Sequence, residues 1–124
     1  MINMKDEAAR MGFEAALAYA PKLNAKDWMF MLRHSPTPER NAAPVTPEPS
    51  LAPLRKRFGE RANNPKSKPR RAFDSAWRTT FRLLMGPLDI DSFLEVQKVQ
   101  RVIVTELRGR LPRALRELRQ DYAS

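Results

Sequence analysis

Proline divides this chain into parts that cannot share one continuous element of secondary structure. Six of the eleven prolines lie between residues 36 and 53, within the segment SPTPERNAAPVTPEPSLAP at residues 35–53. Each proline removes a backbone N–H donor and fixes φ near its extended value, so neither a helix nor a sheet can run through such a segment. We therefore expect a partly disordered linker that joins two helical parts.

The part before the linker, residues 1–34, contains two amphipathic segments. Over residues 4–20, apolar side chains recur every three or four positions, which predicts a helix that buries one stripe: Met4, Ala8, Met11, Ala15 and Ala18. Gly12 weakens this helix by roughly 1 kcal/mol relative to alanine. Asn24 can cap a second helix over residues 25–33, and its apolar run places three residues on one face: Trp28, Met31 and Leu32.

The part after the linker, residues 72–124, also follows a helical period. A helix over residues 72–85 has a single apolar face made by Phe73, Ala76, Trp77, Thr80, Phe81 and Leu84. Gly86 and Pro87 should end it, and a long helix should then begin near Asp89 or Asp91. Gly109 and Pro112 predict a break or a kink, followed by a last helix over residues 111–122.

The expected fold is therefore all-α, a small helical bundle or helical hairpin with a proline-rich, partly disordered central linker. We divide the chain into short N-terminal helices at residues 1–34, a proline-rich and then basic linker at residues 35–71, and a C-terminal helical domain at residues 72–124. Each helical part alone is near the size at which one core is marginally stable. We therefore expect the two parts to pack together, or one of them to dock on a partner or a second copy.

Positive charge is concentrated in residues 54–71, which we call the basic strip. The whole chain has a net charge of +9, and the strip, LRKRFGERANNPKSKPRR, contributes +7 of it, because only Glu60 opposes eight cations: Arg55, Lys56, Arg57, Arg61, Lys66, Lys68, Arg70 and Arg71. A charge excess confined to a short segment indicates contact with an anionic partner. Phe58 could stack on an unpaired base. We expect a short helix over residues 54–62 and no regular structure over residues 63–71 until a partner binds.

No pattern in the sequence predicts catalysis. The chain lacks cysteine, has a single histidine, His34, and contains none of the GxSxG, HExxH or glycine-rich phosphate-loop motifs. We expect a protein that is not an enzyme and has no cofactor and no metal site. Asp6 and Glu7 replace the basic start of a signal peptide, and no apolar run reaches the length of a membrane span, which together favour a cytoplasmic protein without a membrane span.

Two functions remain open. The first is a small basic accessory protein that contacts nucleic acid through the basic strip, as is common among accessory proteins of plasmids and phages. The second is a protein-interaction module or inhibitor, such as an anti-host factor, that docks on a protein partner through apolar helix faces, with anchors at Trp28, Phe30 and Met31. A row of arginines at residues 110–119 is a further candidate contact surface, and the sequence leaves the oligomeric state open.

Overall fold

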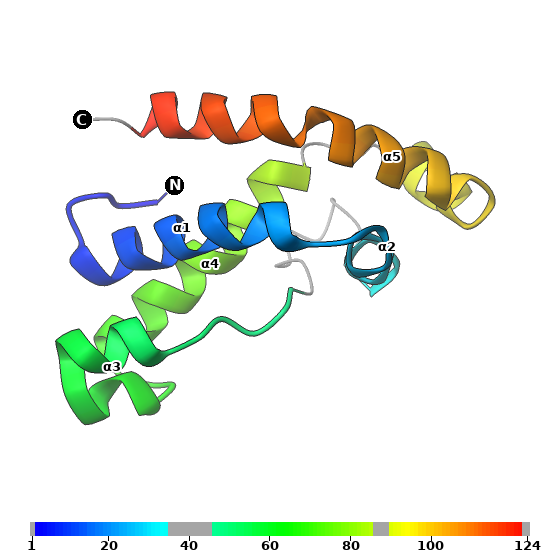
Figure 1. Cartoon of the computed structure of the whole chain (residues 1–124). Coiled ribbons are helices and arrows are strands. Elements are labelled where there is room, and N and C mark those ends of the chain that lie inside the picture. Colours follow the sequence, from blue (N-terminus) through cyan, green and yellow to red (C-terminus); the bar gives the residue numbers. More distant parts are fainter. Residues whose placement is uncertain (1, 35–45, 86–89, 123–124) are drawn as a thin grey trace.

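The computed structural model describes residues 2–34, 46–85 and 90–122, with only the backbone described at residues 32–34 and 90–103. All regular structure in these residues is helical (Figure 1), which confirms the all-α prediction. Residues 35–45 of the predicted linker lie outside the described residues, as do Gly86, Pro87 and Asp89. The elements in chain order are α1 (Glu7–Tyr19), η1 (Ala20–Lys22), α2 (Ala25–His34), α3 (Ala52–Phe58), η3 (Gly59–Asn63), α4 (Lys68–Met85) and α5 (Ile90–Asp121).

Helix α1 begins at an aspartate cap and ends where proline enters the chain. The Asp6 carboxylate accepts a hydrogen bond of 3.0 Å from the Ala9 amide, and Pro21 lies in the 3-10 turn η1 that follows the helix. The predicted period is correct but the predicted stripe is rotated, since Ala18 is exposed and Met11 is only partly buried. The buried face is instead made by Ala8, Ala9, Gly12, Phe13, Ala16 and Leu17.

Helix α2 begins with the cap that the sequence predicts. The Asn24 side chain accepts a 2.9 Å hydrogen bond from the Asp27 amide, and the Asp27 carboxylate accepts a 3.0 Å hydrogen bond from the Asn24 amide. This reciprocal pair satisfies donors at the helix start that have no partner within the helix. Trp28 and Met31 then point into the core.

Helix α4 packs along α1, so the two halves of the chain share one body. Its buried face contains the six residues expected from the period, together with Pro69 and Met85. Gly12 lies at the crossing, where a Cβ atom would come within 2.3 Å of the Phe73 carbonyl oxygen. The absence of a side chain at Gly12 therefore permits the close approach of the two helices.

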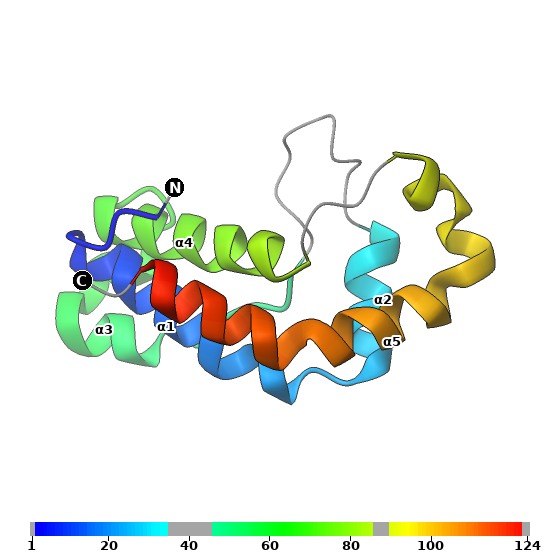
Figure 2. The same ribbon diagram turned by 90° about the horizontal axis from the view of Figure 1, so that it is seen from above.

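Helix α5 is continuous over 32 residues, with Pro112 inside it. Of the two predicted alternatives at Gly109 and Pro112, a break or a kink, the break is therefore wrong. The apolar residues Leu107, Leu115 and Leu118 are buried on both sides of the proline, so packing keeps the helical period across the lost hydrogen bond. Figure 2 shows that α5 is not straight, because its N-terminal part turns away from the line of the C-terminal half that lies beside α1 and α4.

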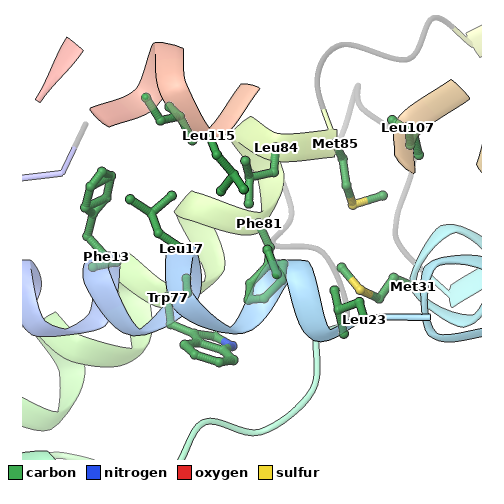
Figure 3. Close-up of a cluster of buried hydrophobic side chains, with 14 of the residues drawn as sticks. Phe13, Leu17, Leu23, Met31, Trp77, Phe81, Leu84, Met85, Leu107 and Leu115 are labelled. Carbon is green, nitrogen blue, oxygen red and sulfur yellow. The ribbon is translucent and has the colours of Figure 1, made fainter. Parts of the chain in front are cut away.

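The main core joins α1, α2, α4 and α5. Figure 3 shows Phe13 and Leu17 of α1 facing Leu84 of α4 and Leu115 of α5, with Met31 and Leu107 closing the other end. The N-terminal helices thus pack on the C-terminal ones. In the described ranges, no helix combines the length and apolar character that a membrane crossing requires.

The chain that leads into α3 is tied to α4 by one side chain. The indole Nε1–H of Trp77 donates to the Pro47 carbonyl oxygen at 3.0 Å and to the Thr46 hydroxyl at 3.1 Å. The Tyr19 ring lies 5.6 Å from the Trp77 ring, centroid to centroid. The Trp77 contacts therefore fix the end of the proline-rich segment on the helical body.

Candidate nucleic-acid interface

The basic strip is folded. Its residues form most of α3, all of η3, and the first turn of α4, which begins at Lys68 rather than at residue 72. The expectation of no regular structure over residues 63–71 is therefore wrong for residue 63, the last residue of η3, and for residues 68–71. The reason is local: the Ser67 hydroxyl accepts a 3.4 Å hydrogen bond from the Arg70 amide, while the Ser67 carbonyl accepts one of 3.0 Å from the Arg71 amide.

A second, small core holds the strip against the helical body. Leu54 of α3 and Ala62 of η3 are buried with Ala8 of α1 and Phe73 of α4. Leu54 and Ala62 are fully buried although cations surround them in the sequence. These two apolar contacts fix which way the neighbouring cationic side chains point.

Gly59 permits the turn between α3 and η3. Its φ is +64°, and a Cβ atom there would meet nothing within 4 Å. The positive φ, not space, is therefore what favours glycine at this position. The turn brings η3 back toward α4 and folds the strip into a compact unit (Figure 1).

Among the residues that the structure describes, two of the eight strip cations are paired with carboxylates. The Arg70 Nε lies 3.0 Å and 3.2 Å from the two Asp74 carboxylate oxygens, and an Arg70 Nη donates to the Ala62 carbonyl oxygen at 3.0 Å. Arg70 therefore ties η3 to α4. Arg57 pairs with Glu7 of α1 at 2.7 Å, in a contact exposed to solvent.

The other six cations are exposed, and none of them lies at salt-bridge distance from a carboxylate in the part of the chain that the structure describes. Arg55 makes a long 3.5 Å hydrogen bond to the neutral side chain of Asn63. The remaining five are Lys56, Arg61, Lys66, Lys68 and Arg71. Most of the strip's charge thus faces solvent without a carboxylate partner among the described side chains.

An open hollow beside the start of α4 gathers four cations. Lys66, Lys68 and Arg71 of the strip line it together with Arg78, and with Asp74, whose carboxylate is paired with Arg70. Arg71 and Arg78 are seven residues apart, two helical turns, and so share one face of α4. This spacing can be read from the sequence, but Arg78 lies outside residues 54–71, the segment that defines the basic strip.

The residues predicted as protein-docking anchors lie in different environments. Trp28 and Met31 are each only 1% exposed and belong to the main core, whereas Phe30 is 55% exposed. The Trp28 Nε1 is buried without a hydrogen-bond partner among the described residues. In this conformation, two of the three predicted anchors are therefore covered by the protein itself.

The arginine row of α5 is a second exposed basic surface. Arg110, Arg113, Arg116 and Arg119 are all exposed, and Arg113 pairs with Glu117 at 2.9 Å. Exposed pairs of this kind contribute little to stability. All members of this row lie on α5, whereas the cations of the hollow come from α4 and from the segment before it.

Comparisons with protein-family models, with curated proteins and with solved structures give no match to this chain.

Proposed function

We propose that this protein is a non-enzymatic accessory protein that binds nucleic acid through the basic strip. The observation that carries the proposal is the set of five exposed strip cations whose side chains have neither a carboxylate partner nor a hydrogen bond among the described residues: Lys56, Arg61, Lys66, Lys68 and Arg71. Binding of such cations to a phosphate backbone releases condensed counterions, which drives association.

The fold supports this proposal because it presents the cations in advance of binding. Leu54, Ala62 and the Arg70–Asp74 pair fix the strip on α1 and α4. A surface already ordered loses less conformational entropy on binding than a flexible tail. Arg70 has a structural role through Asp74 and Ala62, and Arg57 is already paired with Glu7, so both are poor choices for testing binding.

A salt titration of a mobility shift tests the proposal. If all five exposed cations contact duplex phosphates, the log–log salt slope is about −4.5, and affinity falls about 500-fold between 50 and 200 mM salt. A variant with these five residues replaced by glutamine should lose both the affinity and the slope. A wild-type protein that binds neither DNA nor RNA at low salt would contradict the proposal.

A matched control distinguishes the effect of where the positive charge lies from the effect of the total net charge. Replacing the five exposed arginines of α5 by glutamine removes the same charge from another surface: Arg108, Arg110, Arg113, Arg116 and Arg119. We expect this control to keep most of the affinity. If it loses binding while the strip variant retains it, the arginine row is the contact surface and the proposal is wrong.

The alternative, docking on a protein through apolar residues, requires Trp28 and Met31 to leave the core, since both are buried here. A pull-down from native cells, with and without nuclease, distinguishes the two. A stoichiometric protein partner that survives nuclease treatment would favour docking, and its loss would favour nucleic acid.

A further inference from the structure

We infer that the nucleic acid bound by this protein is a duplex, held by its phosphates along α4 without base stacking, and that Arg78 is one of the contacts. The inference rests on the proposed function and concerns which form of nucleic acid binds and which residues hold it. It follows from the state of Phe58, from the spacing of cations along α4, and from the anchoring of that helix.

Single-strand binding would need an aromatic ring free for stacking, but the ring of Phe58 already contacts other groups of the protein. Proteins that bind single strands stack bases on aromatic side chains. Phe58 is the only aromatic residue in the strip, and its ring packs against the second core while the Arg57 guanidinium lies over it, 5.3 Å from the ring centroid. The Glu7 carboxylate holds Arg57 in turn at 2.7 Å. The residues that line the hollow include no aromatic side chain.

The cations of the hollow are spaced along a line. Lys68, Arg71 and Arg78 occupy one face of α4, with Ser75 and Asp74 between the last two, and the Asp74 carboxylate is neutralised by Arg70. At 1.5 Å per residue, Lys68 and Arg78 are about 15 Å apart along the helix axis. A DNA strand in a duplex presents a phosphate about every 3.4 Å of axis, so this length faces about four phosphates. Lys66, beside the helix start, brings the number of cations in the hollow to four.

The helix that bears these cations cannot easily adapt its shape. The opposite face of α4 buries Phe73, Trp77 and Phe81 against the rest of the protein. A fixed row of charges suits a stiff duplex, whose phosphates are also fixed, better than a flexible strand that must be ordered on binding. The contacts would be to the backbone and would therefore carry little sequence preference.

Fluorescence anisotropy with a labelled 20-base-pair DNA duplex and with one of its single strands tests the inference. The four cations of the hollow contribute about −3.6 to the salt slope for the duplex and about −2.8 to that for the single strand, which makes the duplex about sixfold tighter at 0.1 M salt if the two affinities are equal at 1 M salt. Arg78→Gln should reduce the duplex slope by about 0.9 and the affinity about eightfold at 0.1 M salt. Arg110→Gln removes the same charge from α5 and should change neither.

Phe58→Leu completes the test, because it removes the ring but keeps an apolar side chain against the second core. We expect its single-strand affinity to equal that of the wild type. A tighter single-strand complex that weakens in Phe58→Leu would overturn the inference while leaving the proposed function intact, as would an Arg78→Gln variant that behaves like Arg110→Gln. Absence of binding to both DNA forms and to RNA would instead remove the proposed function, and the inference with it.

Discussion

Substitution of Gly12 by alanine should destabilise the protein, although alanine is the better helix former. Gly12 lies inside α1 on its buried face, and an alanine Cβ there would lie 2.3 Å from the Phe73 carbonyl oxygen, 3.1 Å from the Phe73 carbonyl carbon and 3.2 Å from the Ala76 Cβ. The nearest obstacle belongs to the backbone of α4 and cannot rotate away. Relief therefore requires the two helices to separate.

The magnitude follows from two opposing effects. Carbon and carbonyl oxygen normally approach to about 3.3 Å, so the helices must move apart by about 1 Å at this point. Overpacking of a well-packed core typically costs about 1–3 kcal/mol, and we take the upper end because a backbone atom is involved. The change from glycine to alanine returns about 1 kcal/mol of helix propensity. The net loss in the free energy of unfolding is then about 2 kcal/mol.

Urea unfolding followed by circular dichroism at 222 nm measures this loss, and a thermal scan should show a midpoint lower by about 8 °C. Gly109→Ala is the matched control, since Gly109 also lies inside a helix but a Cβ there meets nothing within 4 Å. We expect that control to stabilise the protein by about 0.5–1 kcal/mol. If Gly12→Ala stabilised the protein by a similar amount, the close crossing of α1 and α4 would be refuted.

Three further substitutions test the contacts that hold the strip and the proline-rich segment. Asp74→Asn leaves Arg70 with a neutral partner and should cost about 1–2 kcal/mol, with faster hydrogen exchange in η3; unchanged exchange there would count against the Arg70 tie. Trp77→Phe removes the indole donor to Pro47 and should also cost about 1–2 kcal/mol, with faster proteolysis of the segment before α3; protection equal to the wild type would show that the hydrogen bond does not hold this segment. Gly59→Ala should cost about 1–2 kcal/mol because of the positive φ alone, measured by urea unfolding; a neutral result would contradict the conformation of this turn.

The spacing of apolar residues was enough to predict the helices. Which face each helix buries, and where it ends, depended on tertiary contacts. The predicted face of α4 is the observed one because large side chains such as Trp77 and Phe81 define it without ambiguity. In α1 the stripe of Met and Ala was a weaker guide than the large side chains Phe13 and Leu17, which decided the buried face.

Glycine and proline were the least reliable signals because their effect depends on neighbours that are distant in the sequence. Gly12 weakens an isolated helix, yet in the fold it allows two helices to touch. Pro112 removes one hydrogen bond, but the burial of Leu107 and Leu115 keeps α5 continuous across it. In both cases the deciding contacts involve residues of other helices, which a local reading does not include.

The candidate site was predicted as a region but not as a set of free cations. Glu7, which pairs with Arg57, is 50 residues away in the sequence, and no local pattern indicates this pair. The Arg70–Asp74 pair has the i, i+4 spacing of a helix. The helix predicted from the sequence begins at residue 72, after Arg70, so the sequence does not predict this pair. Arg78 lines the same hollow as the strip cations because α4 extends back to Lys68.

The basic strip lowers the stability of the folded protein, and this loss of stability is relevant to its function. Clustered like charges repel one another and destabilise a compact state, yet only Arg57 and Arg70 of the eight strip cations have carboxylate partners among the described residues. A flexible tail could keep such charges apart, whereas here Leu54 and Ala62 hold them together against α1 and α4. This concentration of positive charge, without carboxylate partners among the described residues for most of it, supports the proposal that an anionic partner binds the strip. Charge reversal tests this explanation: Lys68→Glu should raise the stability of the free protein by relieving repulsion, while weakening nucleic-acid binding more than Lys68→Gln does.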